Sequence, residues 1–492
     1  MTTHSQTIPQ ADPKRWKALA LLCIAGFLTI MDTSIMQVAL PVIKEALGYT
    51  QVNLQWVMNA YIIFFGGLLL LGGKLSDLFG QRRIFMWGFA ILTLASLLAG
   101  LAWNDSVLNV ARALQGAGSA LITPAAMANI MTLFAANPKE MNKALAFWGL
   151  SGAAGGLAGI FLGGVITEWL SWRWTFLIYV PIGILVMFLS LRLLQKGIRR
   201  NGRIDYAGAI SVTAAIVLLV YGIVIAEHNG WGSPSTIWTL TIGALFLIIF
   251  LIIQAKKKEP LMPLRIFKIS NLAAGNVALV MLNGVWIPFT YFMTLYLQQV
   301  LQYSPFSAGV FLIPAPVLMA ITMIFITGKL VEKFGLKMIL IVGFIALGGS
   351  NLLLSFYTPV DGNYLANVLP PLLLASFGRA VAYIPAQTAA ISGAKPEESG
   401  LVSGVYNTTS QIGSAISLAI MVVIAAAVTS SSTVGNSIVA LNEGFQQGFF
   451  WSGMVGFAGA VLALLFIRST NQEKANKRLV SDEENGERKH FN

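Results

Sequence analysis

Charged residues are scarce in this sequence. Asp, Glu, Lys and Arg together make up 11% of its 492 residues, whereas a typical soluble domain contains about 25%. Hydrophobic residues make up 56%, and the mean hydropathy is +0.73. Apolar runs of about twenty residues, the length that a helix needs to cross a bilayer, recur along the chain. This composition excludes a soluble globular protein and predicts an all-α integral membrane protein with many spans.

Reactive and metal-binding side chains are also rare. The lone cysteine, Cys23, excludes an internal disulfide, and three scattered histidines make no metal site. The stretch GGLLLLGGKL (66–75) has the wrong glycine spacing for a phosphate-binding loop, and no Ser or Thr follows its lysine. No nucleophile with a neighbouring base is recognisable. We therefore expect neither an enzyme nor a cofactor, and an ion gradient rather than ATP as the source of energy.

The charges that are present predict a topology. We predict fourteen spans, at about 18–42, 52–73, 84–103, 106–133, 143–166, 174–194, 206–226, 236–254, 272–299, 306–328, 338–357, 364–390, 400–428 and 445–467. With the N-terminus inside, nearly all Lys and Arg residues fall in the inner segments, and only Lys44 and Arg173 fall in outer loops. This asymmetry follows the positive-inside rule. We expect a multi-pass protein of the cytoplasmic (inner) membrane with both termini in the cytoplasm. The formal charge of +12 is then an orientation signal, and nucleic acid is not an expected partner.

A glycine-rich motif with charges occurs twice, each time at the end of an apolar span. It reads 72-GGKLSDLFGQRR-83 after the second span and 328-GKLVEKFGLKM-338 after the tenth. The two align without a gap, and the aligned pairs include Gly73 with Gly328, Asp77 with Glu332, and Gly80 with Gly335. The fourth and twelfth spans also correspond, because each carries a proline near its inner third. Two similar six-helix halves in parallel are typical of transporters, whose substrate site lies between the halves near mid-membrane.

The repeat divides the chain into four parts. We predict an N-terminal six-helix bundle over 1–200, two additional transmembrane helices over 201–260, a C-terminal six-helix bundle over 261–470 and a cytoplasmic tail over 471–492. Basic linkers bracket the additional pair, and the tail is too charged to form a core.

The repeated motif is interpreted as a cytoplasmic gate. Gly73 and Gly80 allow close approach of helix ends and positive φ angles. Asp77, just before a new helix, is placed to accept hydrogen bonds from free backbone N–H groups. Arg82 and Arg83 are placed to anchor to anionic headgroups or to pair with an acid of a neighbouring helix. The counterpart in the second half consists of Gly328, Glu332 and Gly335. The alternative is a turn that only fixes topology.

Several motifs resemble the major facilitator superfamily. The stretch 73-GKLSDLFGQRR-83 is similar to the signature between the second and third helices of that superfamily. Three more stretches resemble motifs of the fourteen-helix drug:proton antiporter branch of that superfamily. They are 31-MDTSIMQVALP-41 for the first helix, 108-LNVARALQGAGSA-120 for the fourth and 172-WRWTFLIYVPIG-183 for the sixth. The resemblance implies the major facilitator fold, with two six-helix bundles plus two extra central helices. It also implies a secondary active transporter that exports amphipathic drugs or toxic compounds in exchange for protons.

The sequence departs from that pattern at four positions. The fifth-helix antiporter motif normally has a Gly-Pro pair before its double glycine, but 159-GIFLGG-164 has Ile160 in place of the proline. Gln37, Tyr179 and Gln81 replace other customary residues. The fold expectation is unaffected. The missing proline weakens the expectation of antiport and keeps two alternatives open, a proton-coupled importer or symporter and an exporter of a specific metabolite, including an anionic one.

Asp32 is the one acid well inside any predicted span. An ionisable group there costs at least ~2.5 kcal/mol on insertion scales, so it needs a function or a partner. Counting ~1.5 Å per residue places Asp32 and Arg112 at the same depth, roughly 9 Å below the outer face. In the superfamily fold the first and fourth helices both line the cavity of the first half, so we expect contact. We predict that this pair couples transport to protons. The alternative is a static ion pair that only fixes helix packing.

Arg379, in the twelfth span, has no acid at its depth. Three partners are considered, namely an anionic group of the substrate, the carbonyls of a helix C-terminus, and the cytoplasmic interface reached by snorkelling. Other polar and aromatic residues inside spans are candidates for the substrate cavity. They are Gln55, Asn59, Trp148, Asn283, Trp286, Tyr383, Asn407 and Gln411.

Glycines recur at every fourth position of the fifth span, where they allow helices to pack backbone to backbone. We expect this face either to slide against a helix of the opposite half or simply to pack closely. A channel would not need matching motifs in both halves, so we predict a carrier. Its expected partners are a small-molecule substrate, protons and the lipid bilayer, and it is expected to function as a monomer.

Overall fold

The computed structural model describes residues 14–134, 137–195, 205–257, 260–262, 264–265, 271–391, 399–432 and 437–467. Within these ranges fourteen helices are long and apolar enough to cross a membrane, and each overlaps one of the predicted spans. The all-α, multi-pass prediction is therefore confirmed. The predicted tail and most of the two basic linkers lie outside the described residues.

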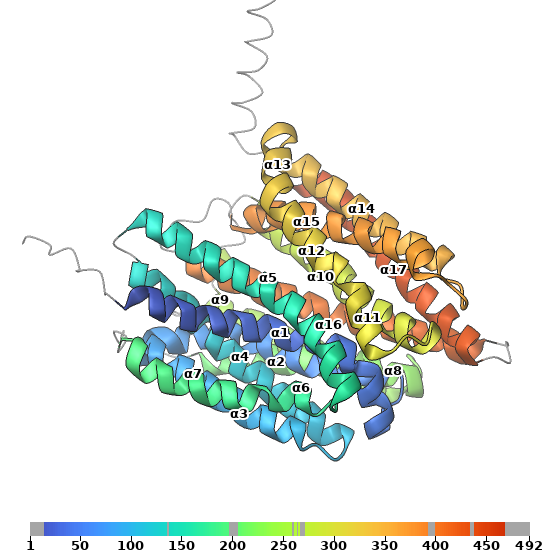
Figure 1. The fold of residues 1–492 in the computed structure, drawn as a ribbon, viewed down its shortest axis with the longest axis horizontal. Coiled ribbons are helices and arrows are strands. Elements are labelled where there is room, and N and C mark those ends of the chain that lie inside the picture. Colours follow the sequence, from blue (N-terminus) through green and yellow to red (C-terminus); the bar gives the residue numbers. More distant parts are fainter. Residues whose placement is uncertain are drawn as a thin grey trace, which may run out of the picture.

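The first six spans form one bundle. Their helices are α1 (Arg15–Leu47), α2 (Trp56–Phe79), α3 (Gln81–Gly100), α4 (Asp105–Phe134), α5 (Pro138–Trp169), and α6 (Trp174–Leu177) followed by α7 (Tyr179–Leu193). Helix α1 packs against α5, and α4 packs between α2 and α3. Figure 1 shows these helices, in blue and green, gathered on one side of the molecule.

The last six spans form a second bundle. Their helices are α10 (Leu272–Leu295), α11 (Pro305–Leu312), α12 (Pro314–Ile321), α13 (Gly328–Phe334), α14 (Leu336–Tyr357), α15 (Leu369–Ile391), α16 (Ser399–Ser431) and α17 (Ser437–Phe466). Helix α14 packs against α15 and α17, while α10 packs against α15, α16 and α17. Helices α11 to α13 make one span, interrupted at Pro314 and by a π-helical turn at Thr322–Thr327. The interruptions free carbonyls that a continuous helix would use.

The seventh and eighth spans, α8 (Tyr206–Asn229) and α9 (Pro234–Lys256), form a hairpin between the bundles. Helix α8 packs against α9, against α2 of the first bundle and against α16 of the second. This arrangement agrees with two extra central helices. The proposed division of the chain at residues 200, 260 and 470 falls in or beside stretches outside the described residues.

Asp205 joins the two helices of the hairpin at one end. Its carboxylate accepts hydrogen bonds from Gly208 N (2.9 Å), Gln254 Nε2 (2.8 Å) and Lys257 Nζ (2.5 Å). Burial raises the pKa of Asp205, but the hydrogen bonds from Lys257, Gly208 and Gln254 together hold it below its ordinary value. The cluster therefore stabilises the hairpin above the ordinary carboxyl pKa, and this stabilisation is lost as the pH falls through the lowered value.

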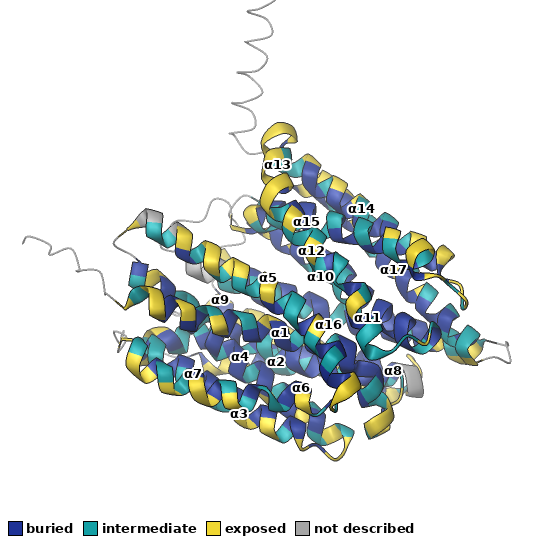
Figure 2. Cartoon of the chain, in the orientation of Figure 1, coloured by how far each residue is buried: buried dark blue, intermediate teal, exposed yellow. Residues whose placement is uncertain are grey.

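Burial follows the bundle arrangement. Figure 2 shows buried residues along the helix faces that meet one another and exposed residues on the outward faces and at the ends. Many exposed positions carry large apolar side chains, for example Trp87, Phe325 and Phe356, which are 68%, 63% and 71% exposed. In a soluble protein such a surface would aggregate. Here it is the surface that meets lipid.

Candidate transport site

Asp32 on α1 and Arg112 on α4 form a buried ion pair. Arg112 Nη1 donates a hydrogen bond to Asp32 Oδ2 at 2.6 Å, and the two side chains are 0% and 2% exposed. The structure thus brings together two residues separated by 80 positions, as expected from their matched depth and from the resemblance to the superfamily fold. Both side chains are sealed from the surface in the observed conformation.

The remaining contacts of Arg112 fix its orientation. Its Nε donates to Val57 O at 2.8 Å, and Nη1 also donates to Gln115 Oε1 at 2.9 Å. Gln115 Nε2 in turn donates to Ser96 Oγ at 2.8 Å, and the Tyr61 ring centroid lies 4.6 Å from Arg112 Cζ. Gln115 and Tyr61 were not among the predicted site residues. The spacing of Gln115 from Arg112, three positions along one helix face, is the signal that would have found it.

One atom of each partner remains unused. Asp32 Oδ1 and Arg112 Nη2 are buried and have no hydrogen-bond partner among the described residues. An unpaired buried polar atom is costly. Asp32 Oδ1 is therefore not occupied by the arginine, and its role as a proton site stays a prediction.

Arg379 on α15 lies in a second polar cluster. Its Nη2 donates to Asn283 Oδ1 of α10 at 2.6 Å. Its Cζ lies 5.0 Å from the ring centroid of Tyr383 and 5.7 Å from that of Trp286. All four side chains are half-buried. The structure thus gathers four of the predicted cavity residues from two distant spans into one cluster.

Two of the three partners considered for Arg379 are not found. Its observed contacts are an amide and two rings at its own level, neither helix carbonyls nor the interface. Within the described part of the chain Arg379 makes no ion pair, and its Nη1 is buried without a hydrogen-bond partner. Snorkelling is unnecessary because Asn283 meets the guanidinium inside the bundle.

Further polar contacts continue beside this cluster. Gln387 Nε2 donates to Tyr406 Oη at 2.8 Å, and Thr409 Oγ1 donates to Asn276 Oδ1 at 2.8 Å. They join α10, α15 and α16. Tyr406 was missed by sequence reasoning, since a tyrosine near a span end is more often an interfacial anchor.

The other cavity candidates lie elsewhere. Gln55 and Asn59 are fully buried in the first bundle, with Asn59 Nδ2 donating to Gln55 Oε1 at 3.2 Å. The Trp148 ring packs on Gly26 of α1. Gln55 and Asn59, both 0% exposed, line no open surface in this conformation, while Trp148 is half-buried.

Two candidates lie on α16. Gln411 packs against Gly66 of α2, where an added Cβ would come within 2.5 Å of the glutamine Cβ, so it lies between the bundles. Asn407 is half-buried on the same helix. Their role as cavity residues stays a prediction.

The two glycine-rich motifs adopt the same type of backbone turn. Gly80 and Gly335 have φ angles of +94° and +84°. Their N–H groups bond to Ser76 O at 3.1 Å and Val331 O at 2.9 Å. Only glycine adopts such angles without strain, so both residues are required where a helix ends and the next begins at once.

The other predicted glycines are ordinary helical positions. Nothing lies within 4 Å of a Cβ added at Gly328, and only Pro124 Cβ lies near one at Gly73. The glycine in close contact with a neighbouring helix is Gly72, one residue before Gly73. A Cβ at Gly72 would collide with the carbonyl oxygen of Ala120. Gly72 therefore permits the close approach of α2 to α4.

The charged residues of the motif do not act as predicted in this conformation. Asp77 is exposed, lies inside the last turn of α2, and makes no hydrogen bond or ion pair with residues that the structure describes. The residue that caps α3 is Gly80. Arg82 Nη1 donates to Leu194 O at 3.1 Å, at the end of α7, instead of pairing with an acid. Arg83 and Glu332 are exposed, and a latch role for these residues stays a prediction.

The glycines of the fifth span pack mostly within their own bundle. Added Cβ atoms at Gly155, Gly159 and Gly163 would press on the backbone of α1. Gly164 alone faces the other bundle, where Phe306 and Pro305 of α11 lie against it. The expectation that this face meets the opposite half is wrong except at Gly164. Close packing explains the rest.

The two bundles contact each other at the end of the membrane that holds the α5–α6 and α10–α11 turns. Phe306 N donates to Glu168 Oε2 at 2.8 Å, and Gln298 Nε2 donates to Val38 O at 2.9 Å. Gly309 packs on the carbonyl of Ile160, the residue that replaces the customary proline.

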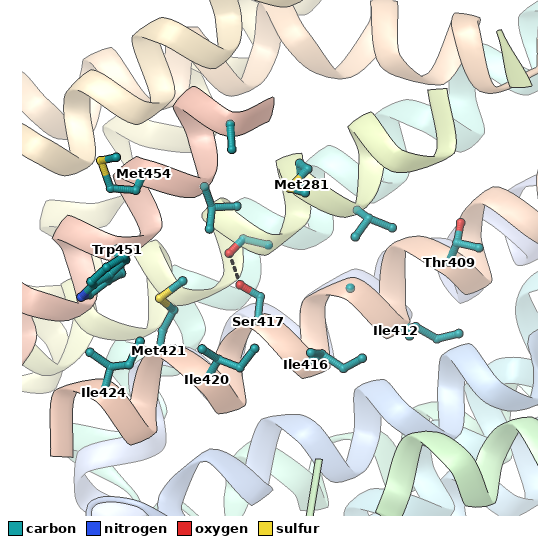
Figure 3. Close-up of a pocket in the computed structure, with 15 residues that line it drawn as sticks. Met281, Thr409, Ile412, Ile416, Ser417, Ile420, Met421, Ile424, Trp451 and Met454 are labelled. Carbon is teal, nitrogen blue, oxygen red and sulfur yellow. Dashed lines mark hydrogen bonds between the residues drawn. The ribbon is translucent and has the colours of Figure 1, made fainter. Parts of the chain in front are cut away.

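An apolar cavity of about 750 Å³ lies between α10, α16 and α17 (Figure 3). No charged side chain lines it, and Trp451 and Met454 at its mouth are 46% and 43% exposed. None of the predicted site residues lines it. It is therefore distinct from the two arginine clusters.

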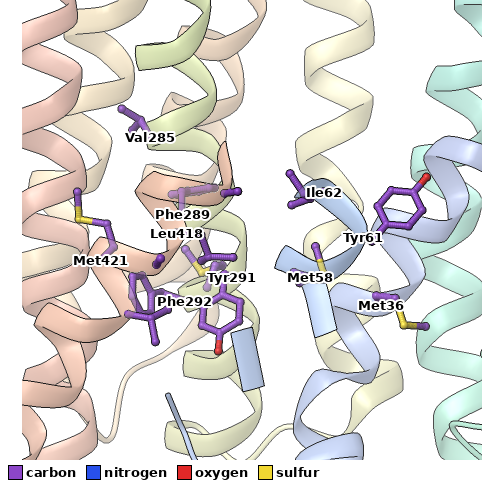
Figure 4. Close-up of a cluster of buried hydrophobic side chains, with 14 of the residues drawn as sticks. Met36, Met58, Tyr61, Ile62, Val285, Phe289, Tyr291, Phe292, Leu418 and Met421 are labelled. Atoms are coloured by element: carbon purple, nitrogen blue, oxygen red, sulfur yellow. The ribbon is translucent and has the colours of Figure 1, made fainter. Parts of the chain in front are cut away.

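A shared hydrophobic cluster extends across the two bundles. Figure 4 shows Met58 and Ile62 of α2 on one side and Phe289, Phe292 and Leu418 of α10 and α16 on the other. Apolar burial in this cluster helps to hold the bundles together.

Solved structures of known transporters share the fold of this chain. Among solved structures, the bacterial homologue of the human lysosomal transporter Spinster, in an inward-facing and unoccupied conformation, aligns with a TM-score of 0.67 at 15% identity over 93% of this chain and 98% of its own. The POT family transporter PepTSo aligns with a TM-score of 0.67 at 14% identity over 92% and 97%. These likenesses show the fold.

The family follows from sequence. The family model of the Major Facilitator Superfamily matches residues 22–418. The cephamycin export protein CmcT of Amycolatopsis lactamdurans is 37% identical over 84% of this chain and 86% of its own length. The puromycin resistance protein pur8 of Streptomyces alboniger is 33% identical over 92% and 90%. The chain belongs to the major facilitator superfamily, and its fourteen spans and exporter relatives agree with the drug:proton antiporter branch.

Proposed function

We propose that this protein exports amphipathic drugs or other toxic compounds across the cytoplasmic (inner) membrane in exchange for protons. Its similarity to proteins named for cephamycin export and puromycin resistance supports export of small molecules. We also propose that both termini lie in the cytoplasm and that it works as a monomer, since a major facilitator chain holds both halves of its own site.

The Asp32–Arg112 pair is the observation that carries proton coupling. It is sealed from solvent and hydrogen-bonded at 2.6 Å. Removing one charge from such a pair leaves the other uncompensated, at a cost of about 3–5 kcal/mol. Protonation of Asp32 therefore shifts the balance between the conformation that holds the pair and one that separates it. Arg112 keeps Val57 O and Gln115 as partners when the carboxylate is neutral.

The contacts between the bundles support alternating access. The Glu168–Phe306 and Val38–Gln298 hydrogen bonds join the bundles at one end. The glycine-rich motifs lie at the opposite end, where Asp77 and Glu332 are exposed. With the proposed orientation, this conformation is closed to the outside and receives substrate from the cytoplasm. Closure of the inner end and opening of the outer end would then release it.

Transport in liposomes tests the proposal. The purified protein is reconstituted, a pH gradient is imposed, and movement of ethidium, a lipophilic cation, is followed. We expect gradient-driven movement by the native chain and its loss in Asp32→Asn. Asp361→Asn, which changes an exposed acid outside the spans, is the matched control and should transport normally. Ethidium binding without a gradient confirms that Asp32→Asn is folded.

The opposite results have clear meanings. Ethidium movement that ignores the gradient, or that persists in Asp32→Asn, would overturn proton coupling through this pair. Movement of substrate in the same direction as the protons would favour the importer or symporter alternative, which the substitution of Ile160 for proline keeps open.

A further inference from the structure

The guanidinium of Arg379 is under-satisfied. An arginine has five N–H donors, yet the structure gives this one a single hydrogen bond, to Asn283 Oδ1. Its Nη1 is buried with no hydrogen-bond partner among the described residues, and no carboxylate within the described ranges pairs with it. A charge inside a membrane span without a counter-charge is unfavourable, even on a half-buried side chain. The cluster thus lacks an anion.

The surroundings define the shape of the missing group. Trp286 and Tyr383 present ring faces to the guanidinium at 5.7 Å and 5.0 Å. Trp286 also stacks on Phe289, with ring centroids 5.4 Å apart and planes inclined by 26°, so its ring is held in place. A carboxylate matches the planar donor fork of arginine, and the rings offer flat apolar surfaces beside it. The chemistry fits a carboxylate next to an aromatic or other ring system.

The position of the cluster suits a transported molecule. Asn283 lies about eleven residues from the start of α10, and Arg379 about twelve residues from the end of α15. At ~1.5 Å per residue both are roughly 17–18 Å from those ends, near the middle of a core about 30 Å thick. Helix α10 also contacts α1 of the other bundle. A lipid phosphate belongs at the headgroup level, so the mid-membrane depth argues for a substrate carboxylate.

In the first bundle the corresponding arginine has a carboxylate partner. There, Arg112 on the fourth helix of the bundle meets Asp32 on the first helix. In the second bundle, Arg379 on the corresponding helix meets Asn283 on the corresponding helix. The helices correspond, although the residues are not at aligned positions. The first arginine has an internal carboxylate, whereas the second has an amide as its hydrogen-bond partner among the described residues.

We propose that Arg379, Asn283, Trp286 and Tyr383 form a subsite that binds the carboxylate of an anionic or zwitterionic amphipathic substrate. The inference rests on the proposed function, because the transported compound is the occupant. Since the Asp32–Arg112 pair is neutral as a whole, Arg379 leaves one uncompensated positive charge among the described span residues of these two clusters. A bound carboxylate neutralises it, which lowers the cost of charge inside the membrane.

Two dyes that differ only in a carboxylate test this subsite. Tetramethylrhodamine carries a free carboxylate, and its methyl ester does not. Their binding to the protein in nanodiscs of zwitterionic lipid is followed by fluorescence anisotropy. We expect the native chain to bind the acid roughly tenfold more tightly than the ester, as charge-assisted hydrogen bonds imply.

Three variants separate recognition from folding. Arg379→Gln removes the charge and should abolish the preference for the acid. Asn283→Asp keeps Arg379 but supplies an internal carboxylate, so it should weaken binding of the acid by about tenfold while keeping binding of the ester. Arg192→Gln changes an exposed arginine that also lies over a ring, that of Phe188, and should leave the preference unchanged.

Each contrary result overturns the inference. The inference is overturned if the two dyes bind equally or if neither binds. It is also overturned if the preference for the acid survives in both Arg379→Gln and Asn283→Asp. These outcomes are independent of the ethidium experiment. If proton-driven ethidium transport persists without a preference for the acid, the proposed function stands and the subsite fails. If the preference exists but Asp32→Asn leaves transport coupled to protons, the subsite stands and the coupling proposal fails.

Discussion

The two bundles are built on the same plan but hold their arginines differently. Arg112 and Arg379 each donate a hydrogen bond of 2.6 Å to a side-chain oxygen on the first helix of their own bundle. The acceptor is a carboxylate in one case and an amide in the other. The Asp32–Arg112 pair is neutral and sealed, while the Arg379 cluster carries a positive charge and is half-buried among rings. The proposed proton switch and the proposed anion subsite thus differ in one respect, an aspartate in the first bundle where the second has an asparagine.

Breaking the pair in the first bundle has the largest expected effect. Arg112→Gln leaves the Asp32 carboxylate buried without a counter-charge, which costs about 3–5 kcal/mol in the free energy of unfolding. Adding Asp32→Asn removes the stranded charge, so the double variant should be more stable than Arg112→Gln alone. Thermal unfolding in detergent, followed by tryptophan fluorescence, measures both.

The matched change in the second bundle sharpens the contrast. Arg379→Gln strands no carboxylate, so we expect it to cost less than about 1 kcal/mol. Equal destabilisation by Arg379→Gln and Arg112→Gln would contradict a difference between the two arginines. So would simple additivity of the destabilising effects of Arg112→Gln and Asp32→Asn in the double variant.

The glycine-rich turn is where the bundles should behave alike. Gly80→Ala and Gly335→Ala force a side chain into positive φ, at about 1–3 kcal/mol each. Gly73→Ala and Gly328→Ala occupy helical positions without close contacts and should be neutral or stabilising by about 0.5–1 kcal/mol. Chemical denaturation of the four variants gives the comparison. A difference between Gly80→Ala and Gly335→Ala would show that the turns are not equivalent.

Giving Arg379 a carboxylate partner like that of Arg112 should have an intermediate effect on stability. Asn283→Asp gives Arg379 the partner that Arg112 has, and we expect stabilisation by about 1–2 kcal/mol. Asn276→Asp is the matched control, because that asparagine lies on the same helix, is buried, and bonds to Leu272 O and Thr409. It should destabilise the protein. Equal melting temperatures for the two variants would contradict the idea that Arg379 lacks an anion.

The contact between the bundles at the proposed outer end gives the smallest expected effect. Glu168→Gln replaces the carboxylate that accepts from Phe306 N with a neutral amide, weakening an exposed contact by about 0.5–1 kcal/mol. A few-fold shift toward an outward-open state should appear in distances between spin labels at positions 103 and 356, in a Cys23→Ser background. Glu45→Gln, also an exposed acid, is the control. An unchanged distance distribution would show that the contact does not hold the outer end closed.

Much of the architecture could be predicted from the sequence. The fourteen spans and the repeated turn at Gly80 and Gly335 depended on local apolarity and glycine spacing. Contact between Asp32 and Arg112 was predicted from their depth along the helices and from the superfamily fold that the motifs resemble. The predicted capping by Asp77 failed because the residue lies within α2, three positions before the glycine that ends it. The glycines of the fifth span were found, but the helix that they face was not, because spacing alone does not identify a partner.

The sequence by itself determined that this is a polytopic helical membrane protein with two related halves, because insertion depends on the apolarity and length of each segment. It also named Asn283, Trp286, Arg379 and Tyr383 as separate candidates. Only the tertiary structure decided that these four meet, because α10 and α15 are distant in sequence and are joined by packing between helices. The same packing decided that Arg112 has a carboxylate partner while Arg379 has none among the described residues, and that difference in charge is what sets the two clusters apart.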